Sequence, residues 1–394
     1  MLAIVTTHPI QYQTPIWRAL AADGHVPFEV WYLTDFGVRP SRDRQFDKTF
    51  QWDIDLLSGY PHAFLKTAAG ATPADFWRCR LAENLRARVA NACVKALWIQ
   101  GWQVAGYWQA ARQAKAAGAE VWLRAESNDL APVPLWKRPL KRAALGYLFE
   151  RIGRFFIIGS ANRRLYRNYG VPESKLLAAP YAVDNARFAA QADALLGQRA
   201  DIRRAWGIAD DAFCVLFCGK FIAKKRPLDL IAAARQAIAS GTKVHLLFAG
   251  SGELGNALRA ACRVAIDADE RGITSTDAGA PPASFTGFLN QSEISRAYVA
   301  ADALVLPSDA GETWGLVVNE AMASGLPCIV SEACGCAEDL VAPQWRFPLD
   351  DSHAVALRII AMKASGAGTQ KTLPTIADTV AAVAQAYTAL SARQ

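Results

Sequence analysis

Short apolar runs of strand length recur along the chain and alternate with amphipathic, alanine-rich stretches. In the first half these runs lie at 2–6, 28–33, 96–99, 120–124, 155–159 and 176–180. A second series follows at 214–218, 244–249, 303–306 and 328–331. Runs that are apolar on both faces and alternate with helices are typical of a parallel sheet covered by helices on each side. The pattern therefore predicts two α/β domains in succession.

The strand pattern stops in the segment 180–188, just before a polar, alanine-rich stretch. We place the linker at 181–190. A chain of 394 residues exceeds the ~250 to 300 residues over which one hydrophobic core grows, so two domains suit its length. The predicted parts are an N-terminal Rossmann-like domain at 1–183, a C-terminal Rossmann-like domain at 184–370, and a terminal helix within 371–394 that packs on the N-terminal domain or on its neighbour.

Open α/β sheets bind ligands beyond the carboxyl ends of their strands. Two such domains that face one another build a deep cleft, and the loops after the strands line it. In the second domain these loops are Gly219–Lys220, Gly250–Glu253, Gly287–Phe288 and the segment after Ser308. We therefore expect the ligand-binding residues of this domain in these four places.

The amino-acid composition excludes several classes of protein, but it does not identify the function. Hydrophobic residues make up 52% and charged residues 20%, which is typical of a folded globular chain. The start at 1–7 predicts a strand rather than a secretory signal, and no apolar run reaches the ~20 residues that cross a bilayer. The eight cysteines lack the spacing of a zinc site or a disulfide framework. We expect a cytoplasmic protein with reduced thiols.

The formal charge of +7 favours anionic ligands. Phosphates, nucleic acid and acidic lipids would all satisfy it. No nucleic-acid-binding motif, and no basic helix with base-stacking aromatic residues, is present in the sequence. We therefore expect no nucleic acid partner.

The segment 307–327 carries the most chemistry. A strand ends there in a Gly-bearing turn and a helix begins near Trp314, so that free backbone N–H groups face the cleft. Glu312 precedes this helix and Glu320 lies within it. Carboxylates accept hydrogen bonds from vicinal hydroxyl pairs such as those of sugars. The two glutamates are either sugar ligands of this kind or solvated charges of a surface helix.

This segment resembles the Glu-x7-Glu signature of family 4 retaining glycosyltransferases of GT-B fold. Further blocks are similar to that family in the same order: 180–188 to its hinge, 217–230 to its Gly-Arg/Lys-Leu and Lys pattern, 247–253 to its Gly-x-Gly turn, and 285–291 to the strand that meets the base. The resemblance covers nearly all of the second domain.

The resemblance implies a nucleotide-sugar site in the second domain. It assigns the donor diphosphate to Lys220 and Lys225, with Arg226 adjacent. It assigns the ribose hydroxyls to Glu320 and the hydroxyls of the transferred sugar to Glu312, which is the catalytic candidate of this domain. Further donor contacts are implied for Gly219, Gly250, Gly252, Phe288, Thr313, Trp314, Gly315 and Leu316. We expect Lys225 and Glu320 to be exposed cleft residues rather than core.

The first domain departs from the family. Residues 7–12 stand where the family often has a Gly-rich loop, and 100–102 stand where many members have a histidine. The polar segment 124–128 ends a strand that is otherwise apolar. These positions are either functional or structural. The catalytic candidates here are His8, Arg124 and Glu126, and the acceptor-side candidates are Gln11, Gln100, Trp102 and Ser127.

Asp53 and Asp55 have the Asp-x-Asp spacing by which another transferase fold binds a metal ion. They lie within 50–57, an alternating segment that predicts an edge strand of the first domain, far in sequence from the donor blocks. We therefore expect no metal site and no cofactor.

The sequence thus predicts a GT-B glycosyltransferase that moves a hexose-type sugar from a UDP or GDP donor to a glycan, lipid-linked or small-molecule acceptor. Retention of configuration follows from the resemblance, and the expected pathway is the synthesis of polysaccharide, glycolipid or glycoconjugate. An epimerase of the same fold and a binding partner without turnover are the alternatives.

The segment 134–150 combines four basic residues with apolar ones. It is either a covering helix of the domain or a weak contact with the inner face of the plasma membrane.

Overall fold

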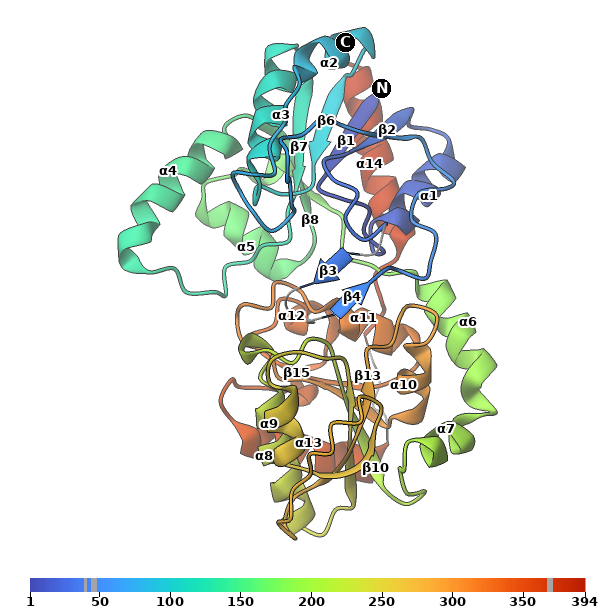
Figure 1. Cartoon of the computed structure of the whole chain (residues 1–394). Helices are drawn as coiled ribbons and strands as arrows, with labels where there is room; N and C mark the ends of the chain where they lie inside the picture. The colour runs from blue at the N-terminus through green and yellow to red at the C-terminus, as the bar shows by residue number, and fades with distance from the viewer. Residues whose placement is uncertain (39–40, 44–47, 367–370, 394) are drawn as a thin grey trace. The chain divides into compact units, whose positions relative to one another are not determined.

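The computed structural model describes residues 1–38, 41–43, 48–366 and 371–393. The chain divides into two compact units, each with its own parallel sheet (Figure 1). Unit 1 consists of Met1–Ser41, Phe50–Ala182 and Pro374–Gln394, and unit 2 of Arg42–Thr49 and Val183–Leu373. A short two-stranded sheet pairs β3 (Ser41–Asp43) with β4 (Lys48–Phe50).

Unit 1 contains a seven-stranded sheet in the order β5-β2-β1-β6-β7-β8-β9, with parallel pairing throughout. Its strands are β1 (Leu2–Thr6), β2 (Phe28–Tyr32), β5 (His62–Phe64), β6 (Ala96–Ile99), β7 (Glu120–Arg124), β8 (Ile152–Ile157) and β9 (Leu176–Ala178). Its α-helices are α1 (Thr14–Asp23), α2 (Leu85–Asn91), α3 (Ala105–Ala116), α4 (Arg138–Phe149), α5 (Ser160–Asn168) and α14 (Ile376–Ser391). The strand order reverses at β1, whose neighbours are β2 and β6, and such a point is where α/β sheets bind ligands.

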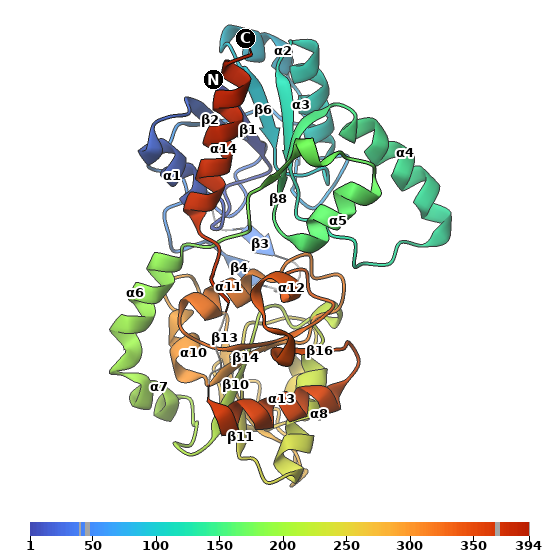
Figure 2. The ribbon, with the colours of Figure 1, turned by 180° about the vertical axis from the view of Figure 1, so that it is seen from behind.

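Alternate residues of β1 supply two separate cores. Leu2 and Ile4 belong to a core that also holds Val383 of α14, whereas Ala3 and Val5 belong to the core on the other face. Side chains of a strand alternate between faces, so both faces of the sheet need an apolar cover. The last helix of the chain supplies part of that cover, and it lies beside α1 (Figure 2).

Unit 2 repeats the architecture in the order β12-β13-β11-β10-β14-β15-β16. Its strands are β10 (Phe213–Cys218), β11 (Val244–Ala249), β12 (Arg263–Asp267), β13 (Pro282–Gly287), β14 (Ala303–Leu306), β15 (Cys328–Ser331) and β16 (Arg346–Phe347). Its α-helices are α6 (Asn185–Leu196), α7 (Arg199–Ala205), α8 (Pro227–Ala239), α9 (Gly255–Ala260), α10 (Ser295–Ala300), α11 (Leu316–Ala323), α12 (Ala337–Leu340) and α13 (Ser352–Ser365). A 3₁₀ turn, η3 (Ala223–Lys225), precedes α8.

The prediction of two parallel α/β sheets is confirmed, and each predicted apolar run overlaps a strand. No apolar run marks β5, β12, β13 or β16, although the resemblance of 285–291 indicates a strand where β13 ends. Three of these are edge or next-to-edge strands that are short or exposed, so they carry no apolar run. The fourth, β13, is buried but contains hydroxyl residues. Ser284 satisfies its hydroxyl by donating to the carbonyl oxygen of Trp206 at 2.6 Å.

Within the described ranges, no helix combines the length and the apolar character that crossing a membrane requires.

Candidate functional site

The loops that follow β10, β11 and β13 are joined by backbone hydrogen bonds at the carboxyl edge of the unit 2 sheet. The amide of Gly219 donates to the carbonyl of Ala249 at 2.9 Å. The amide of Gly250 donates to the carbonyl of Gly287 at 2.8 Å. Three loops that are distant in sequence therefore form one rigid platform where α/β sheets hold their ligands.

Gly250 and Gly252 are required by this platform itself. Both have positive φ angles, 139° and 151°. A Cβ atom on Gly250 would overlap the carbonyl oxygen of Gly219, and one on Gly252 would lie 2.7 Å from that of Phe221. The resemblance implies that these two glycines let a ligand come close to the backbone. In the structure it is the neighbouring loop 219–221 that comes close to them.

Lys225 and Glu312 form an ion pair across two of these loops. Their side chains are only 16% and 12% exposed, so the pair is largely withdrawn from water. Backbone bonds fix both ends: the amide of Asp309 donates to the carbonyl of Lys224, and the amide of Glu312 donates to the carbonyl of Asp309, each at 2.9 Å. The structure thus brings together two residues that are 87 positions apart in the sequence.

The other cations of this region differ in their setting. Lys220 is half-buried in the loop after β10. Arg226 forms ion pairs with Asp229 and Asp350, which hold its guanidinium beside α8. These carboxylates raise the pKa of Arg226. The guanidinium of Arg226 therefore already has two carboxylate partners within unit 2.

Glu320 is buried in α11, and the expectation of an exposed cleft residue is wrong for it. The helix lies on the sheet, and its residues from Val318 to Met322 are buried. One carboxylate oxygen of Glu320 accepts a hydrogen bond from the hydroxyl of Tyr298 at 2.5 Å. The other oxygen, Oε1, is buried without a hydrogen-bond partner among the described residues. Burial raises the pKa of Glu320 to about 7.

Several polar residues of this part of unit 2 are not among the predicted site residues, although Arg187, Gln291 and Ser308 lie within segments that resemble the family. Tyr298 comes from α10, and Arg187 and Gln291 come from α6 and the loop after β13. The guanidinium of Arg187 donates to the side-chain oxygen of Gln291 at 2.6 Å, and both residues favour the ionised form of Glu320. Ser308, which follows β14, has a buried hydroxyl with no hydrogen-bond partner in the described structure. Packing brings Arg187, Gln291 and Tyr298 to Glu320 from separate segments of the chain.

The amino end of α11 is built on a left-handed residue. Gly315 has a φ of 102°, and a Cβ atom there would lie 2.7 Å from the side chain of Leu306. The indole of Trp314 is buried and donates to Asn319 at 2.8 Å, so its role is structural support. Thr313 and Leu316 beside it are half-buried, as is Phe288 after β13. The first amides of a helix lack intrahelical acceptors, which suits this end to oxygen atoms of a ligand.

Unit 1 holds a cavity of about 360 Å³ at the ends of β1, β6 and β7. Its wall includes five of the seven first-domain candidates: His8, Gln100, Trp102, Glu126 and Ser127. The amide of Gln100 is buried, and its Nε2 has no hydrogen-bond partner within the described ranges. The cavity thus combines an indole, a carboxylate and uncharged hydrogen-bonding groups, a mixture of apolar and polar groups that is typical of small-molecule sites.

His8 is a neutral group in this cavity. Its Nδ1 lies 2.9 Å from the hydroxyl of Thr7, and its ring contacts Phe36 edge-on. Burial lowers the pKa of His8 to about 4. At neutral pH the imidazole therefore acts as a hydrogen-bonding group rather than as a cation.

Arg124 and Gln11 are both buried and do not line this cavity. The guanidinium of Arg124 lies over the ring of Tyr181, 4.8 Å from its centroid, and Tyr181 donates a hydrogen bond to Glu126. Burial lowers the pKa of Arg124. Arg124 is thus held against Tyr181 at the end of β7 and is not part of the cavity wall.

The Asp-x-Asp segment is not an edge strand, contrary to expectation, because β4 ends at Phe50 and bends follow. Asp55 instead accepts hydrogen bonds from the amides of Leu57 at 2.9 Å and Ser58 at 3.2 Å. Its carboxylate therefore stabilises a local turn. Within the described ranges no three His, Cys, Asp or Glu side chains are placed to hold a metal ion.

Residues 212–364 match the family described as glycosyl transferases group 1. The match lies entirely within unit 2 and includes the Lys225–Glu312 pair and Glu320.

Curated proteins similar to part of this chain are described as glycosyltransferases. A D-inositol 3-phosphate glycosyltransferase of Geodermatophilus obscurus is 31% identical over 210 residues, or 50% of this chain and 43% of the relative. An uncharacterized glycosyltransferase of Methanocaldococcus jannaschii is 30% identical over 154 residues, or 38% and 36%. The matched regions span less than half the length of these two relatives.

Solved structures show the fold over nearly the whole chain. HepE of Anabaena, in complex with UDP and glucose, has a TM-score of 0.61 at 14% identity, covering 98% of this chain and 94% of HepE. Sucrose-phosphate synthase of Thermosynechococcus elongatus has a TM-score of 0.60 at 18% identity, covering 100% and 96%. UDP-GlcNAc 2-epimerase of M. jannaschii has a TM-score of 0.58 at 11% identity, covering 99% and 100%. The fold is GT-B.

We predict that Glu320 makes stability depend on pH. Its folded pKa of about 7 lies above the ordinary value of 4.5, so its contribution is complete below pH 4.5 and is lost as the pH rises through 7. Glu320→Gln mimics the protonated form. Relative to wild type, this variant should gain about 2 to 3 kcal/mol in unfolding free energy between pH 5 and pH 8.

Chemical denaturation at both pH values measures this difference. Glu253→Gln, which changes an exposed carboxylate of the same unit, serves as the control and should show no such gain. If the unfolding free energy of Glu320→Gln equals that of wild type at both pH values, the raised pKa of a buried Glu320 is contradicted.

Proposed function

We propose that this protein is a glycosyltransferase that moves a hexose-type sugar from a UDP or GDP donor to a hydroxyl group of an acceptor. The observation that carries the proposal is the Lys225–Glu312 ion pair in the loops at the carboxyl edge of the unit 2 sheet, together with the buried carboxyl of Glu320 in α11, the helix that follows Glu312. A diphosphate needs cations and a sugar needs carboxylates, and this edge supplies both kinds of group. The match of residues 212–364 supports the same assignment.

The Lys225–Glu312 ion pair explains how the site is kept ready for a donor. Each charge is largely withdrawn from water, so each needs a partner while no donor is bound. In the proposal, the donor diphosphate takes over Lys225, with Lys220 beside it. Glu312 is thereby released to accept hydrogen bonds from the hydroxyls of the transferred sugar. Donor binding exchanges one ion pair for another and leaves no buried charge alone.

Glu320 is proposed to hold the ribose. Its Oε1 is buried without a hydrogen-bond partner in the described structure, which costs free energy until a hydroxyl donates to it. Tyr298 fixes the other oxygen and so orients the carboxyl group. The amides near Thr313 and Leu316, together with the groups near Phe288, complete the proposed donor site.

The acceptor is proposed to bind in the unit 1 cavity that His8, Gln100, Trp102, Glu126 and Ser127 line. During transfer the bond from the anomeric carbon to the diphosphate breaks, and a bond to the acceptor oxygen forms. With retention of configuration, the departing diphosphate oxygen takes the acceptor proton. A strong protein base is then unnecessary, which agrees with a His8 whose pKa is lowered.

The central experiment measures release of free nucleoside diphosphate from a panel of UDP and GDP sugars. A transferase releases it at a high rate only when an acceptor is present. Conversion of the donor without any acceptor would instead indicate an epimerase, and binding without either reaction would indicate a protein without turnover. The acceptors to offer are glycans and lipid-linked sugars, because we place the reaction in cytoplasmic glycan or glycolipid assembly.

Lys225→Gln should reduce transfer roughly 10- to 100-fold, because loss of a charged hydrogen-bonding partner costs ~1.5 to 3 kcal/mol. The matched control is Lys243→Gln, which removes an exposed lysine paired with Asp211 in the same unit. Thermal unfolding of both variants checks the fold. Activity of Lys225→Gln within twofold of wild type would remove this lysine from the donor site.

Transfer should persist after strong chelation. In the proposal Lys220, Lys225 and the amino end of α11 supply the positive charge that a metal ion supplies in other transferases. The assay compares the rate in EDTA with the rate after Mg²⁺ or Mn²⁺ is restored. A complete loss that the metal reverses would overturn this part of the proposal.

The α4 segment is proposed to contact anionic membranes weakly. It exposes Leu135, Trp136 and Leu140 next to Lys137 and Arg138, and basic residues contribute ~1 kcal/mol each near an anionic surface. Co-sedimentation with phosphatidylglycerol vesicles should therefore be detectable at low salt and weaken at high salt. Absence of binding at low salt, or binding that salt does not change, would refute this contact.

A further inference from the structure

The inward face of α4 changes character along the helix. On this face, the residues of the second half of the helix are apolar and those of the first half are cationic. They share one face because they follow one another at intervals of three and four positions. The apolar residues, buried in the unit 1 core, are Leu145, Leu148 and Phe149. The cationic residues are Arg138, Lys141 and Arg142. The helix thus leaves the core, and its first half carries three exposed cations on the face that is buried further along.

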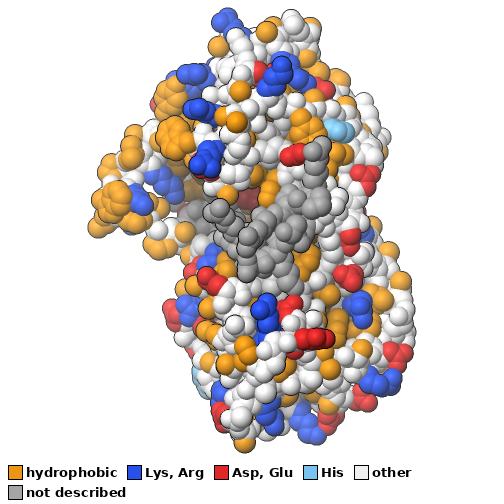
Figure 3. All heavy atoms as spheres, in the orientation of Figure 1, with side chains coloured by type: hydrophobic (Ala, Val, Ile, Leu, Met, Phe, Trp, Pro, Cys, Tyr) orange, Lys and Arg blue, Asp and Glu red, His pale blue; other side chains and the backbone are white. Residues whose placement is uncertain are grey.

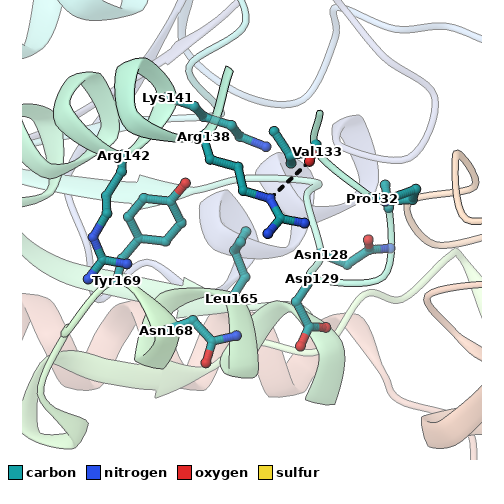
Figure 4. A pocket seen from close by; sticks show the side chains of 11 residues that line it. Asn128, Asp129, Pro132, Val133, Arg138, Lys141, Arg142, Leu165, Asn168 and Tyr169 are labelled. Atoms are coloured by element: carbon teal, nitrogen blue, oxygen red, sulfur yellow. Dashed lines mark hydrogen bonds between the residues drawn. The ribbon is translucent and has the colours of Figure 1, made fainter. Parts of the chain in front are cut away.

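Beneath the cationic half lies a cavity of about 420 Å³ (Figure 4). Its other walls are the loop 128–133 and the end of α5 with Tyr169. The side chain of Arg138 reaches across the cavity and donates to the carbonyl of Val133 at 3.0 Å. Arg142 lies over the ring of Tyr169, 6.0 Å from its centroid. Both guanidinium groups are therefore positioned by neutral partners.

The positive charge of this cavity is not neutralised by the described part of the chain. No carboxylate of the described residues forms an ion pair with Arg138, Lys141 or Arg142. Asp129 also lines the cavity, but Arg164 of α5 donates to it at 3.2 Å. Its negative charge is therefore already balanced, and the cavity stays cationic.

Two physical costs show that these cations do not serve the stability of the helix. The amino end of a helix carries a partial positive charge, which disfavours cations, and the first turn of α4 contains no acidic residue. Like charges three and four positions apart also repel one another. A bound anion would relieve both effects. The arrangement is thus unfavourable when empty and favourable when an anion occupies it.

The first half of α4 and the 3₁₀ turn before it, η1 (Leu135–Lys137), also expose apolar side chains. Leu135, Trp136 and Leu140 are 74%, 76% and 75% exposed, and hydrophobic side chains gather on this projecting segment in Figure 3. Exposed apolar side chains therefore lie beside the exposed cations Arg138, Lys141 and Arg142. The two surfaces together match a molecule that has an anionic group at one end and an apolar chain at the other.

We propose that this cavity binds the phosphate group of an amphiphilic molecule, whose apolar chain lies along Leu135, Trp136 and Leu140. Arg138, Lys141 and Arg142 hold the phosphate oxygens. If the protein is the proposed glycosyltransferase, this molecule is the lipid-linked acceptor, and in that respect the inference rests on the proposed function. The binding site itself is independent of transfer.

The test is calorimetric titration of the full chain with dihexanoyl phosphatidic acid below its micelle concentration. Arg138→Gln/Lys141→Gln should weaken binding at least tenfold. Arg112→Gln/Lys115→Gln removes the same charge from exposed positions of α3 and should stay within twofold of wild type. Dihexanoyl phosphatidylcholine, which has no net charge, should bind at least tenfold more weakly. Equal losses in the two double variants, or equal binding of the two lipids, would overturn the proposal.

Inorganic phosphate separates the two parts of the ligand. The double variant Leu135→Ser/Leu140→Ser should bind dihexanoyl phosphatidic acid severalfold more weakly than wild type. Its weak binding of inorganic phosphate should be unchanged. If inorganic phosphate binds as tightly as phosphatidic acid, the apolar chain does not contribute to binding. The ligand would then be a soluble phosphate ester. Because none of these titrations involves a donor, absence of transfer would refute the acceptor role alone.

Discussion

The close backbone contact between two loops of unit 2 is the constraint on which the candidate donor site depends. Gly250 and Gly252 leave room for the loop 219–221 to lie directly against them. That contact determines where the chain continues into η3, and therefore where Lys225 meets Glu312. Any side chain at either glycine would have to displace a backbone segment rather than another side chain. The ion pair and the amino end of α11 inherit their geometry from this packing.

Burial, rather than the number of charges, distinguishes the two halves of the proposed chemistry. In unit 2 the side chains of Lys225 and Glu312 are largely withdrawn from water and form an ion pair. Glu320 is buried, and burial raises its pKa. In unit 1 the cavity near His8 is predominantly uncharged at neutral pH, because burial lowers the pKa of that histidine. A charged diphosphate is suited to the former environment and a hydroxyl acceptor to the latter.

The cationic cavity under α4 completes this division. Its three cations form no ion pair with a carboxylate of the described residues, and exposed apolar side chains lie beside it. A helix with this composition is unfavourable as a simple cover for a sheet, since its first turn opposes the helix dipole. The phosphate and the apolar chain of the proposed ligand would offset this conflict. Local conflicts of this kind tend to mark functional positions.

The sequence by itself determined the two parallel sheets, because buried parallel strands need continuous apolar runs and those runs are readable. It also pointed to Lys225, Glu312 and Glu320, since an ordered set of motifs is local along the chain. Tertiary structure alone decided that Lys225 pairs with Glu312, that Tyr181 covers Arg124, and that Tyr298 meets a buried Glu320. These contacts join residues 87, 57 and 22 positions apart, counted from their residue numbers. Burial and pairing at such separations depend on how the elements pack, and no local pattern encodes that.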